Sequence, residues 1–405
     1  MSEAESEAGA RRWRSRSRTP ELPAVVLRKD LARSIRRGHP WLYRDAVAAP
    51  EGLSNGDLVE VRTRDGRPIA RGYWDDASPI AVRILESGGP GHRFAEPQQL
   101  VSERLHTALD HRLDRLDLAW TNAFRWVHGE ADLLPGIHVD FYAGTAVVRF
   151  DGDGARAFYD GIEARLRAPA GDRLGLRKVM DRADRPADAD QRRVLEEGAT
   201  FIVDLANAQK GGLFLDQREN RLRVAAMAKG KSVLNLFGYT GGFSVHAALA
   251  GASRTDTVDV AAPAIEAARR NFEANGLSIE NAGFYAEDAF EFLTRAAKRG
   301  DVWDIVVSDP PSFAPRKDAA PAALKAYERL HRLAAAVVAP VGLFCASSCS
   351  SHVGTQAFLD TVEAGVRQAG RHWRLESMHG AAFDHPVLEA FPEGDYLKFA
   401  IGRID

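Results

Sequence analysis

The chain has 405 residues, more than a single hydrophobic core usually serves, so two or three domains are expected. Its apolar share of 45%, charged share of 27% and formal net charge of -2 are ordinary for a globular protein. The whole molecule therefore has no nucleic-acid-binding signature, and only local clusters of charge can indicate such a partner.

Cysteine content and hydropathy exclude further classes. The chain has only two cysteines, Cys345 and Cys349, so a disulfide framework is excluded and a cytoplasmic location is expected. A zinc site would need ligands almost wholly from His, Asp and Glu, and no metal is predicted. No stretch approaches the roughly 18–20 apolar residues of a membrane span, so no membrane partner is predicted.

The N-terminal region is strongly basic. Residues 1–21 lack the apolar segment of a secretory signal, and we expect a disordered basic tail. Basic side chains continue as far as Arg44, with few acids between them. A solvated tail explains the charge up to Arg18, whereas the later residues adjoin an ordered module and are interpreted as RNA-phosphate contacts. These candidate substrate-binding residues are Arg28, Lys29, Arg33, Arg36 and Arg37.

Two folded segments follow in chain order. Residues 22–90 predict a small all-β domain with a hairpin turn at Asp65-Gly66, and the Gly- and Pro-rich stretch 87–97 predicts a linker. Residues 97–205 mix helical and strand patterns and predict a compact α+β middle domain. The expected strands are 57–63, 69–74, 80–86, 124–127, 137–142, 145–150, 178–180 and 199–205, and the expected helices are 100–116 and 155–167.

From residue 206 to residue 405 the pattern becomes strand-helix alternation. This predicts an α/β, Rossmann-like doubly wound sheet that binds ligands at the carboxyl ends of its strands. Segments 374–380 and 396–404 are expected to form a final antiparallel pair. The other expected strands are 232–237, 255–260, 282–289, 304–311 and 341–350, with helices at 243–250 and 262–274.

A glycine-rich turn, Gly238 to Phe243, follows the first of these strands. Glycines let the backbone approach a ligand, and the next helix offers free N–H groups. The turn lacks the spaced G-x-G-x-x-G of dinucleotide binders, which argues against a dehydrogenase. Asp259 and Asp288 follow the next two strands, where carboxylates can meet a ribose and an adenine edge. Helix capping is the alternative for each acid, but two acids behind a glycine turn favour a nucleoside ligand.

A candidate catalytic pair follows the fourth and fifth strands. Asp309-Pro310-Pro311 ends one strand, and the prolines hold the acid at the rim of the sheet. Cys349 ends the neighbouring strand, so the two side chains are expected to lie close together. A thiolate that adds to C6 of cytosine makes C5 carbanion-like and able to accept a methyl group. Cys345 lies mid-strand in an apolar run and is expected to be a buried small side chain.

With these residues in place, the chain resembles a known family: the class I ribosomal RNA large-subunit methyltransferases that form 5-methylcytosine and carry an N-terminal PUA domain. The resemblance covers nearly everything after residue 22. The matching segments are Arg37 to Trp41, Gly56-Asp57, Glu130 with Leu134-Pro135-Gly136, Val139-Asp140, Gln209 to Gly212, Phe214 to Arg218, Asn235 to Phe243, Asp309 to Phe313, Ser348-Cys349-Ser350, Asp384 to Pro386 and Pro392 to Lys398.

The resemblance implies a cofactor, a substrate and a set of site residues. The cofactor is S-adenosylmethionine and the partner is large-subunit ribosomal RNA, while the existence of a homodimer is left open. Cys349 and Asp309 are implied as catalytic, and Pro310 and Pro311 join the basic residues in binding substrate. The implied cofactor-binding residues are Phe237, Gly238, Tyr239, Thr240, Gly241, Asp259, Asp288 and Asp309.

The chain departs from the family pattern in three places. Ser312 stands where many relatives have Lys after the double proline, and Ala208 and Gly211 change a Gly-Gln-Lys-Thr-Gly segment. Other families of RNA cytosine methyltransferases have a second cysteine beside the acid-proline motif, and this chain has none there. Another base must then release the thiol adduct, and His352 and His385 are the candidates considered.

Two alternative functions are weighed against this one. A methyltransferase acting on a guanine nitrogen needs no cysteine and usually has an aromatic residue directly after the acid-Pro-Pro motif. Here Ser312 holds that position and Phe313 comes one residue later. A non-catalytic RNA-binding protein of the same fold would be expected to have lost its cofactor loop, yet the loop glycines, Asp259 and Asp288 are all present.

Overall fold

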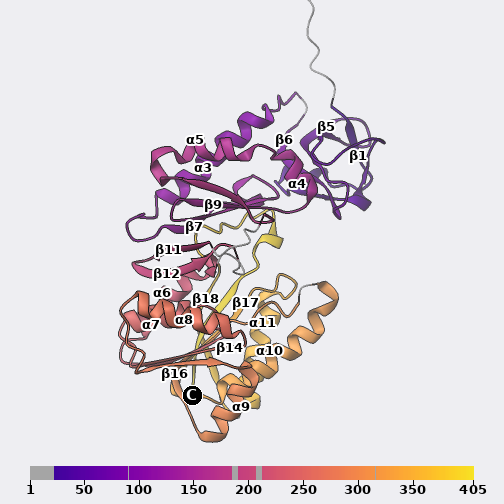
Figure 1. The fold of residues 1–405 in the computed structure, drawn as a ribbon. Coiled ribbons are helices and arrows are strands. Elements are labelled where there is room, and N and C mark those ends of the chain that lie inside the picture. The colour runs from indigo at the N-terminus through magenta and orange to yellow at the C-terminus, as the bar shows by residue number, and fades with distance from the viewer. Residues whose placement is uncertain (1–21, 90, 185–189, 207–211, 315) are drawn as a thin grey trace, which may run out of the picture. The chain divides into compact units, whose positions relative to one another are not determined.

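The computed structural model of the chain describes residues 22–89, 91–184, 190–206, 212–314 and 316–405. The expected tail, and the departures at Ala208 and Gly211, lie outside the described residues. The chain divides into two compact units, one of Met1–Phe94 with Gly152–Phe158 and one of Ala95–Asp151 with Tyr159–Asp405 (Figure 1). No helix in the described part of the chain is long and apolar enough to cross a membrane.

The first unit is a six-stranded β-sheet in the order β2-β6-β5-β4-β1-β3. Alternate residues of its strands are buried, such as Val59 and Val61, because successive side chains of a strand point to opposite faces. Helix α4 completes this unit: Phe158 stacks on Tyr73 with ring centroids 4.6 Å apart. The elements are β1 (Ala24–Leu27), α2 (Ala32–Arg36), β2 (Trp41–Tyr43), β3 (Val47–Ala48), β4 (Leu58–Arg62), β5 (Pro68–Trp74), β6 (Ile80–Ser87) and α4 (Asp153–Phe158).

The expected single helix over 155–167 is wrong. Helix α4 ends at Phe158 and α5 begins at Ile162, after Gly161 with φ of 68°. A left-handed residue interrupts a helix, and Gly is the residue that adopts this conformation most readily. The break also separates the units, because α4 belongs to the first and α5 to the second.

The second unit begins with a four-stranded sheet in the order β10-β9-β8-β7 and an antiparallel hairpin, β11-β12. Phe201 of the hairpin lies in one hydrophobic cluster with Val245 and Phe272 from the helices of the larger sheet. The segment expected as a separate middle domain therefore shares a core with the rest of this unit. Its elements are α3 (Pro97–Leu113), β7 (Ala123–His128), β8 (Ile137–Tyr142), β9 (Thr145–Phe150), α5 (Ile162–Leu174), β10 (Lys178–Asp181), β11 (Gln191–Glu196) and β12 (Ala199–Asp204).

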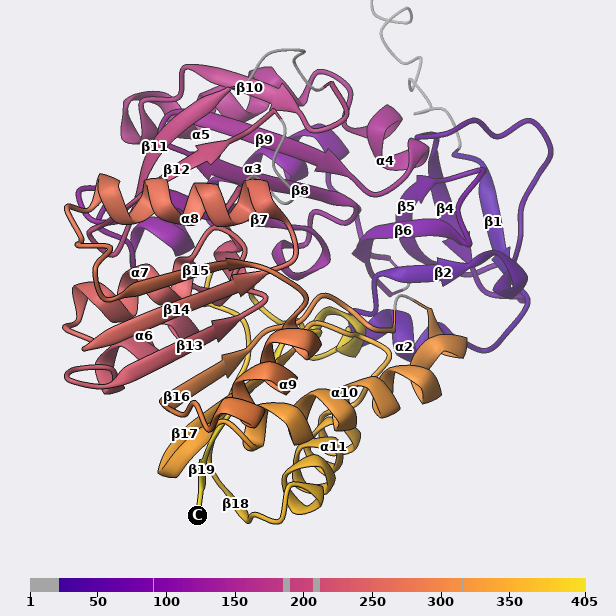
Figure 2. The ribbon, with the colours of Figure 1, turned by 60° about the horizontal axis from the view of Figure 1, so that its bottom comes forward.

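A seven-stranded sheet in the order β15-β14-β13-β16-β17-β19-β18 forms the rest of the second unit. Helices α6 to α8 lie against one face and α9 to α11 against the other (Figures 1 and 2). The elements are α6 (Arg218–Met227), β13 (Ser232–Leu236), α7 (Gly242–Leu249), β14 (Arg254–Asp259), α8 (Ala262–Ala274), β15 (Ala282–Ala286), α9 (Ala289–Arg299), β16 (Trp303–Ser308), α10 (Ala320–Ala335), β17 (Val338–Ser348), α11 (Thr355–Gln368), β18 (Trp373–His379) and β19 (Lys398–Ile404).

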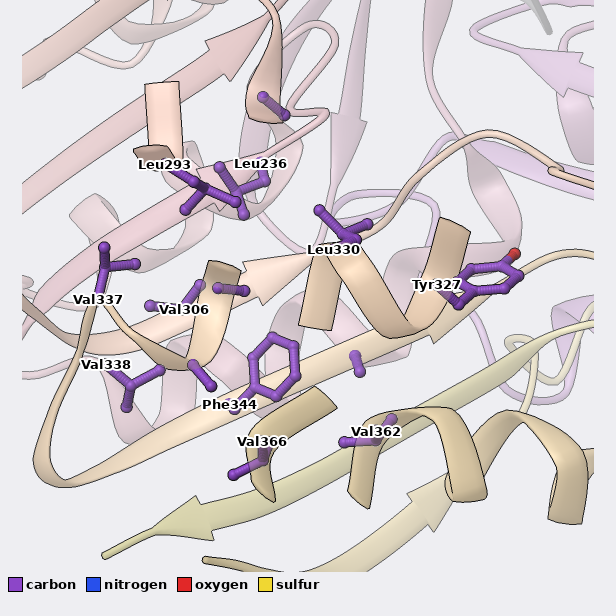
Figure 3. Close-up of a cluster of buried hydrophobic side chains, with 14 of the residues drawn as sticks. Leu236, Leu293, Val306, Tyr327, Leu330, Val337, Val338, Phe344, Val362 and Val366 are labelled. Atoms are coloured by element: carbon purple, nitrogen blue, oxygen red, sulfur yellow. The ribbon is translucent and has the colours of Figure 1, made fainter. Parts of the chain in front are cut away.

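The sheet has a hydrophobic core on each face. Val306 and Phe344 pack with the α9–α11 side (Figure 3), whereas Val307 and Cys345 pack toward α6 and α7. Strands β13 to β17 are parallel, and the expected final antiparallel pair is confirmed as β18 and β19. Because the strand order reverses on the two sides of β13, a crevice is expected at the carboxyl ends of these strands. The predicted Rossmann-like α/β fold is confirmed.

Candidate active site

A cavity of about 390 Å³ opens at the carboxyl ends of the parallel strands. Residues that follow β13, β14, β16 and β17 line it, together with a segment that precedes α6. The lining residues are Leu213, Phe214, Asp216, Gln217, Arg221, Phe237, Gly238, Tyr239, Thr240, Gly242, Phe243, Asp259, Val260, Ala261, Asp288, Ala289, Asp309, Pro310, Pro311, Cys349 and Leu397. The topology thus brings together all the predicted cofactor and catalytic residues except Gly241.

The turn after β13 is tightly constrained. Phe237 and Tyr239 adopt left-handed backbone conformations, with φ of 56° and 47°, which are uncommon for residues other than Gly. A Cβ at Gly238 would lie 2.5 Å from Cγ2 of Thr257, so no larger residue fits there. Strained backbone conformations of this kind persist only where the surrounding structure maintains them, and they are found most often at ligand and active sites.

Gly241 lies between Thr240 and Gly242, which line the cavity, and is not itself part of the lining. It is the N-cap of α7 with φ of 82°, and a Cβ there would lie 2.9 Å from Cβ of Ala268. The residue is glycine because helices α7 and α8 approach closely at a left-handed turn.

The two strand-end acids hold the cavity wall in different ways. Asp259 accepts hydrogen bonds from the backbone N–H groups of Tyr239 and Ala261, both at 2.9 Å, and so ties the glycine turn to the end of β14. Asp288 accepts N–H groups of Phe290 and Glu291 as the N-cap of α9. For Asp288 the alternative of helix capping is therefore correct, and the residue lines the cavity as well.

Asp309 and Cys349 directly follow the neighbouring strands β16 and β17, which pair in parallel with Ser308 opposite Ala346. Both residues line the cavity. Nε2 of Gln217 donates to Oδ1 of Asp309 at 2.9 Å and to Oγ of Ser347 at 3.0 Å. Gln217 therefore orients the Asp309 carboxylate and joins it to the strand that carries Cys349.

Side chains of flanking residues fix the turn around Cys349. The hydroxyl of Tyr327, from α10, hydrogen-bonds with the hydroxyls of Ser348 at 2.9 Å and Ser350 at 3.1 Å. Ser312 hydrogen-bonds with Ser350 at 3.1 Å, which gives the turn a further neutral contact.

The two cysteines differ in exposure. Cys345 is fully buried within β17, as expected, and burial raises the pKa of its thiol to about 12. Cys349 is partly exposed and lines the cavity. Because only the thiolate is a good nucleophile, burial opposes reaction of Cys345, whereas Cys349 is accessible from the cavity.

Neither histidine suggested as a base lines the cavity. His352 is exposed to solvent, and His385 is buried beside Asp384, with Nδ1 to Oδ1 at 3.0 Å. Asp216 does line the cavity, and it accepts a hydrogen bond of 2.6 Å from the hydroxyl of Tyr396. Asp216 is therefore the better placed acid-base group.

Residues 185–381 match the family described as S-adenosylmethionine-dependent methyltransferase, and residues 25–87 match the PUA-like domain. The ribosomal RNA large subunit methyltransferase I of Shewanella denitrificans is 33% identical over 396 residues, covering 94% of this chain and 99% of the relative. The namesake from Aeromonas hydrophila has the same identity and coverage.

The chain belongs to the ribosomal RNA large subunit methyltransferase I family. Its fold is that of a solved methyltransferase in complex with SAH, with a TM-score of 0.80, 24% identity, and coverage of 95% of this chain and 100% of that one. A Streptococcus mutans structure described as a SAM-dependent methyltransferase also has a TM-score of 0.80, with 23% identity and coverage of 94% and 100%. S-adenosylmethionine is the cofactor of this family, as predicted.

In this family member the basic residues of the first unit surround a groove of about 530 Å³. Three of the predicted substrate-binding residues line this groove, namely Lys29, Arg33 and Arg36. The other two, Arg28 and Arg37, do not. Arg64 and Arg67, at the β4–β5 hairpin, line the same groove and were not among the predicted residues. The only signal for these two arginines was the predicted hairpin turn at Asp65-Gly66. A turn alone does not indicate where an exposed arginine will lie in the folded domain.

One group of side chains has the donors of a metal site: Glu130, His138 and Asp151, with ligand atoms within 4.8 Å of one another. Nε2 of His138 lies 2.9 Å from Asp151, and Arg125 donates to its Nδ1 at 3.2 Å. Burial lowers the pKa of His138, so the ring is neutral, with Nε2–H donating to Asp151. Both ring nitrogens are thus engaged in hydrogen bonds.

Proposed function

We propose that the chain methylates C5 of a cytosine in large-subunit ribosomal RNA through a covalent adduct with Cys349. The observation that carries the proposal is the position of Cys349 and Asp309 at the ends of two paired strands, both lining one cavity. The names of the family members support ribosomal RNA as the substrate. The cysteine supports C5 chemistry, because methylation of a nitrogen needs no thiolate.

The residues of the cavity fit S-adenosylmethionine. Gly238 lets the backbone approach the ligand, and the carboxylate of Asp259 would bind the ribose hydroxyls while its contacts with Tyr239 and Ala261 keep it in place. Asp288 would lie at the adenine edge. When bound, the cofactor supplies a methyl group that is activated for transfer to a nucleophile.

The chain's own side chains would prepare the base to accept that group. The target cytosine would be flipped into the cavity, where Asp309 would accept a hydrogen bond from the N4 amino group. The Cys349 thiolate would form a bond to C6 and shift an electron pair to C5, which then takes the methyl. Removal of the C5 proton by Asp216 would return the pair to the ring and break the S–C6 bond.

The guanine-nitrogen alternative is less well supported. Its expected aromatic residue after the acid-Pro-Pro motif is missing from the cavity wall: Phe313 packs against Tyr327, with ring centroids 4.8 Å apart. The polar Ser312 instead contacts the turn that carries Cys349.

The first unit would capture the RNA. Its groove has five basic and two acidic side chains, which gives a positive surface for phosphates. The capture residues in this proposal are Lys29, Arg33, Arg36, Arg64 and Arg67.

Mass spectrometry of ribosomal RNA, with and without the protein, tests the proposal. We expect 5-methylcytosine to appear at one site only when the active chain is present. RNA with 5-fluorocytosine at that site should trap a covalent complex, because fluorine cannot leave as a proton does. A methylated guanine in place of 5-methylcytosine would establish the alternative function.

A further inference from the structure

A buried lysine lies beside the turn that carries Cys349. Lys398 is the first residue of β19 and pairs with Ser348, the last residue of β17. Its Nζ donates to the carbonyl oxygen of Ser350 at 2.9 Å and to that of Tyr396 at 3.1 Å. The ammonium group is therefore hydrogen-bonded to the backbone of Ser350, the residue that directly follows Cys349.

The charge of Lys398 lacks a direct anionic partner. The residue is only 5% exposed, and within the described part of the chain its Nζ forms hydrogen bonds with neutral carbonyl groups and no ion pair. Burying a charge without a paired counter-charge is costly, so such a lysine needs an electrostatic reason for its position. Burial lowers the pKa of Lys398 below its ordinary value, and the anionic groups that oppose this and favour its charged form are the exposed Asp395 and the thiolate of Cys349.

We infer that the Lys398 ammonium stabilises the thiolate of Cys349 and so makes this cysteine nucleophilic at neutral pH. The inference rests on the proposed role of Cys349 as the nucleophile. A nearby positive charge favours the ionised form of a thiol, whose ordinary pKa is about 8.5. Lys398 acts through Cys349 and is a positioning residue.

The other ionisable groups around the turn cannot supply this charge. Burial raises the pKa of Tyr327 and of Tyr396, so both hydroxyls stay protonated and neutral near pH 7. Asp309 and Asp216 also line the cavity, and as anions they would oppose ionisation of the thiol. The remaining described cation of the cavity wall, Arg221, forms an ion pair with the buried Glu196.

Alkylation of the full-length protein with iodoacetamide, a neutral reagent, tests the inference without RNA. The rate at Cys349 is followed against pH by peptide mass spectrometry, and the buried Cys345 is expected to stay unreacted. In the unmodified protein the inflection should lie below about 8.5. Lys398→Met should raise the pH of this inflection by about one unit and lower the alkylation rate of Cys349 at pH 7 roughly threefold. The limiting rate at high pH should increase, because a more basic thiolate is a better nucleophile.

Two further variants separate charge from structure. Tyr327→Phe removes hydrogen bonds to the same turn but no charge, so it should leave the inflection in place. Lys398→Arg keeps a cation and should restore much of the shift. Calorimetric binding of S-adenosylmethionine checks that each variant is folded.

An unchanged inflection in a folded Lys398→Met protein would overturn the inference. An inflection at or above about 8.5 in the unmodified protein would overturn it without any variant. Either result would leave the C5 proposal standing, because the fluorocytosine adduct tests that proposal separately. Conversely, if Lys398→Met raises the inflection as expected but fluorocytosine RNA forms no covalent adduct, only the proposed function would be overturned.

Discussion

The basic groove of the first unit and the cavity of the second unit both contain charged side chains, but in opposite surroundings. The groove residues Arg33 and Arg36 are exposed to solvent, where interactions with phosphates are long in range and weakened by salt. In and around the cavity, Arg221 and Lys398 are buried and held by fixed partners. The groove is therefore suited to affinity and the cavity to orientation and chemistry, so variants of the two regions should change different measured quantities.

The largest expected effect is on turnover. Cys349→Ala should reduce methylation by at least about a thousandfold, because the covalent step is lost, while cofactor and RNA binding stay close to normal. Single-turnover kinetics and calorimetry measure the two effects. Cys345→Ala is the matched control, since that thiol is buried in the core and should affect stability at most. Wild-type turnover by Cys349→Ala would contradict the C5 assignment.

The next effect is on stability. Glu196 on β11 is buried and accepts hydrogen bonds from Arg221 at 2.6 Å, and it lies 3.0 Å from His246. Burial alone would raise the pKa of its carboxyl, but the charge of Arg221 and the contact with His246 lower it to about 2. Glu196→Gln should cost about 3–5 kcal/mol because it leaves Arg221 buried without its counter-charge.

The pH dependence of unfolding gives a second check on Glu196. A folded pKa below the ordinary value of 4.5 contributes stability above pH 4.5, and this contribution is lost as pH falls toward about 2. Urea unfolding across this window should therefore show a shallower loss of stability in Glu196→Gln than in the unmodified chain. Equal slopes would show that the buried pair contributes nothing to acid sensitivity.

A smaller effect is expected on the cofactor. Asp259→Ala should weaken S-adenosylmethionine binding by about 1–3 kcal/mol, because ribose hydroxyls would lose a charged acceptor. Calorimetry measures this directly. The backbone N–H groups of Tyr239 and Ala261 bond to different carboxylate oxygens, so Asp259→Asn removes the charge and keeps an acceptor for only one of them. Any affinity that it retains over Asp259→Ala reflects that remaining loop contact. Unchanged affinity in Asp259→Ala would remove the residue from the cofactor site.

The smallest effect concerns RNA affinity. Replacing Arg33 and Arg36 by Ala should flatten the dependence of log affinity on log salt by about 0.7 for each lost contact with single-stranded RNA, with cofactor binding intact. Arg28 and Arg37 are equally basic neighbours that do not line the groove, so their double variant is the matched control. Equal slopes for the two double variants would show that the groove has no special role.

Sequence alone determined the features that depend on local pattern and chain order. Strand-helix alternation predicted the Rossmann-like sheet, and in such a sheet the ends of successive strands meet at one edge. Asp259, Asp309 and Cys349 could therefore be assigned to one site from their positions after strands. The mid-strand position of Cys345 likewise predicted its burial.

Tertiary structure decided the contacts between segments that are distant in the chain. Gln217 meets Asp309 across 92 positions, and Lys398 meets Ser350 across 48, so no local spacing could indicate either contact. Arg64 and Arg67 join the groove only because the β4–β5 hairpin folds back onto β1, next to α2. The contact of Gly241 with Ala268 was also unforeseen, because local sequence cannot tell a glycine required by helix packing from one that faces a ligand, since both need the same backbone freedom.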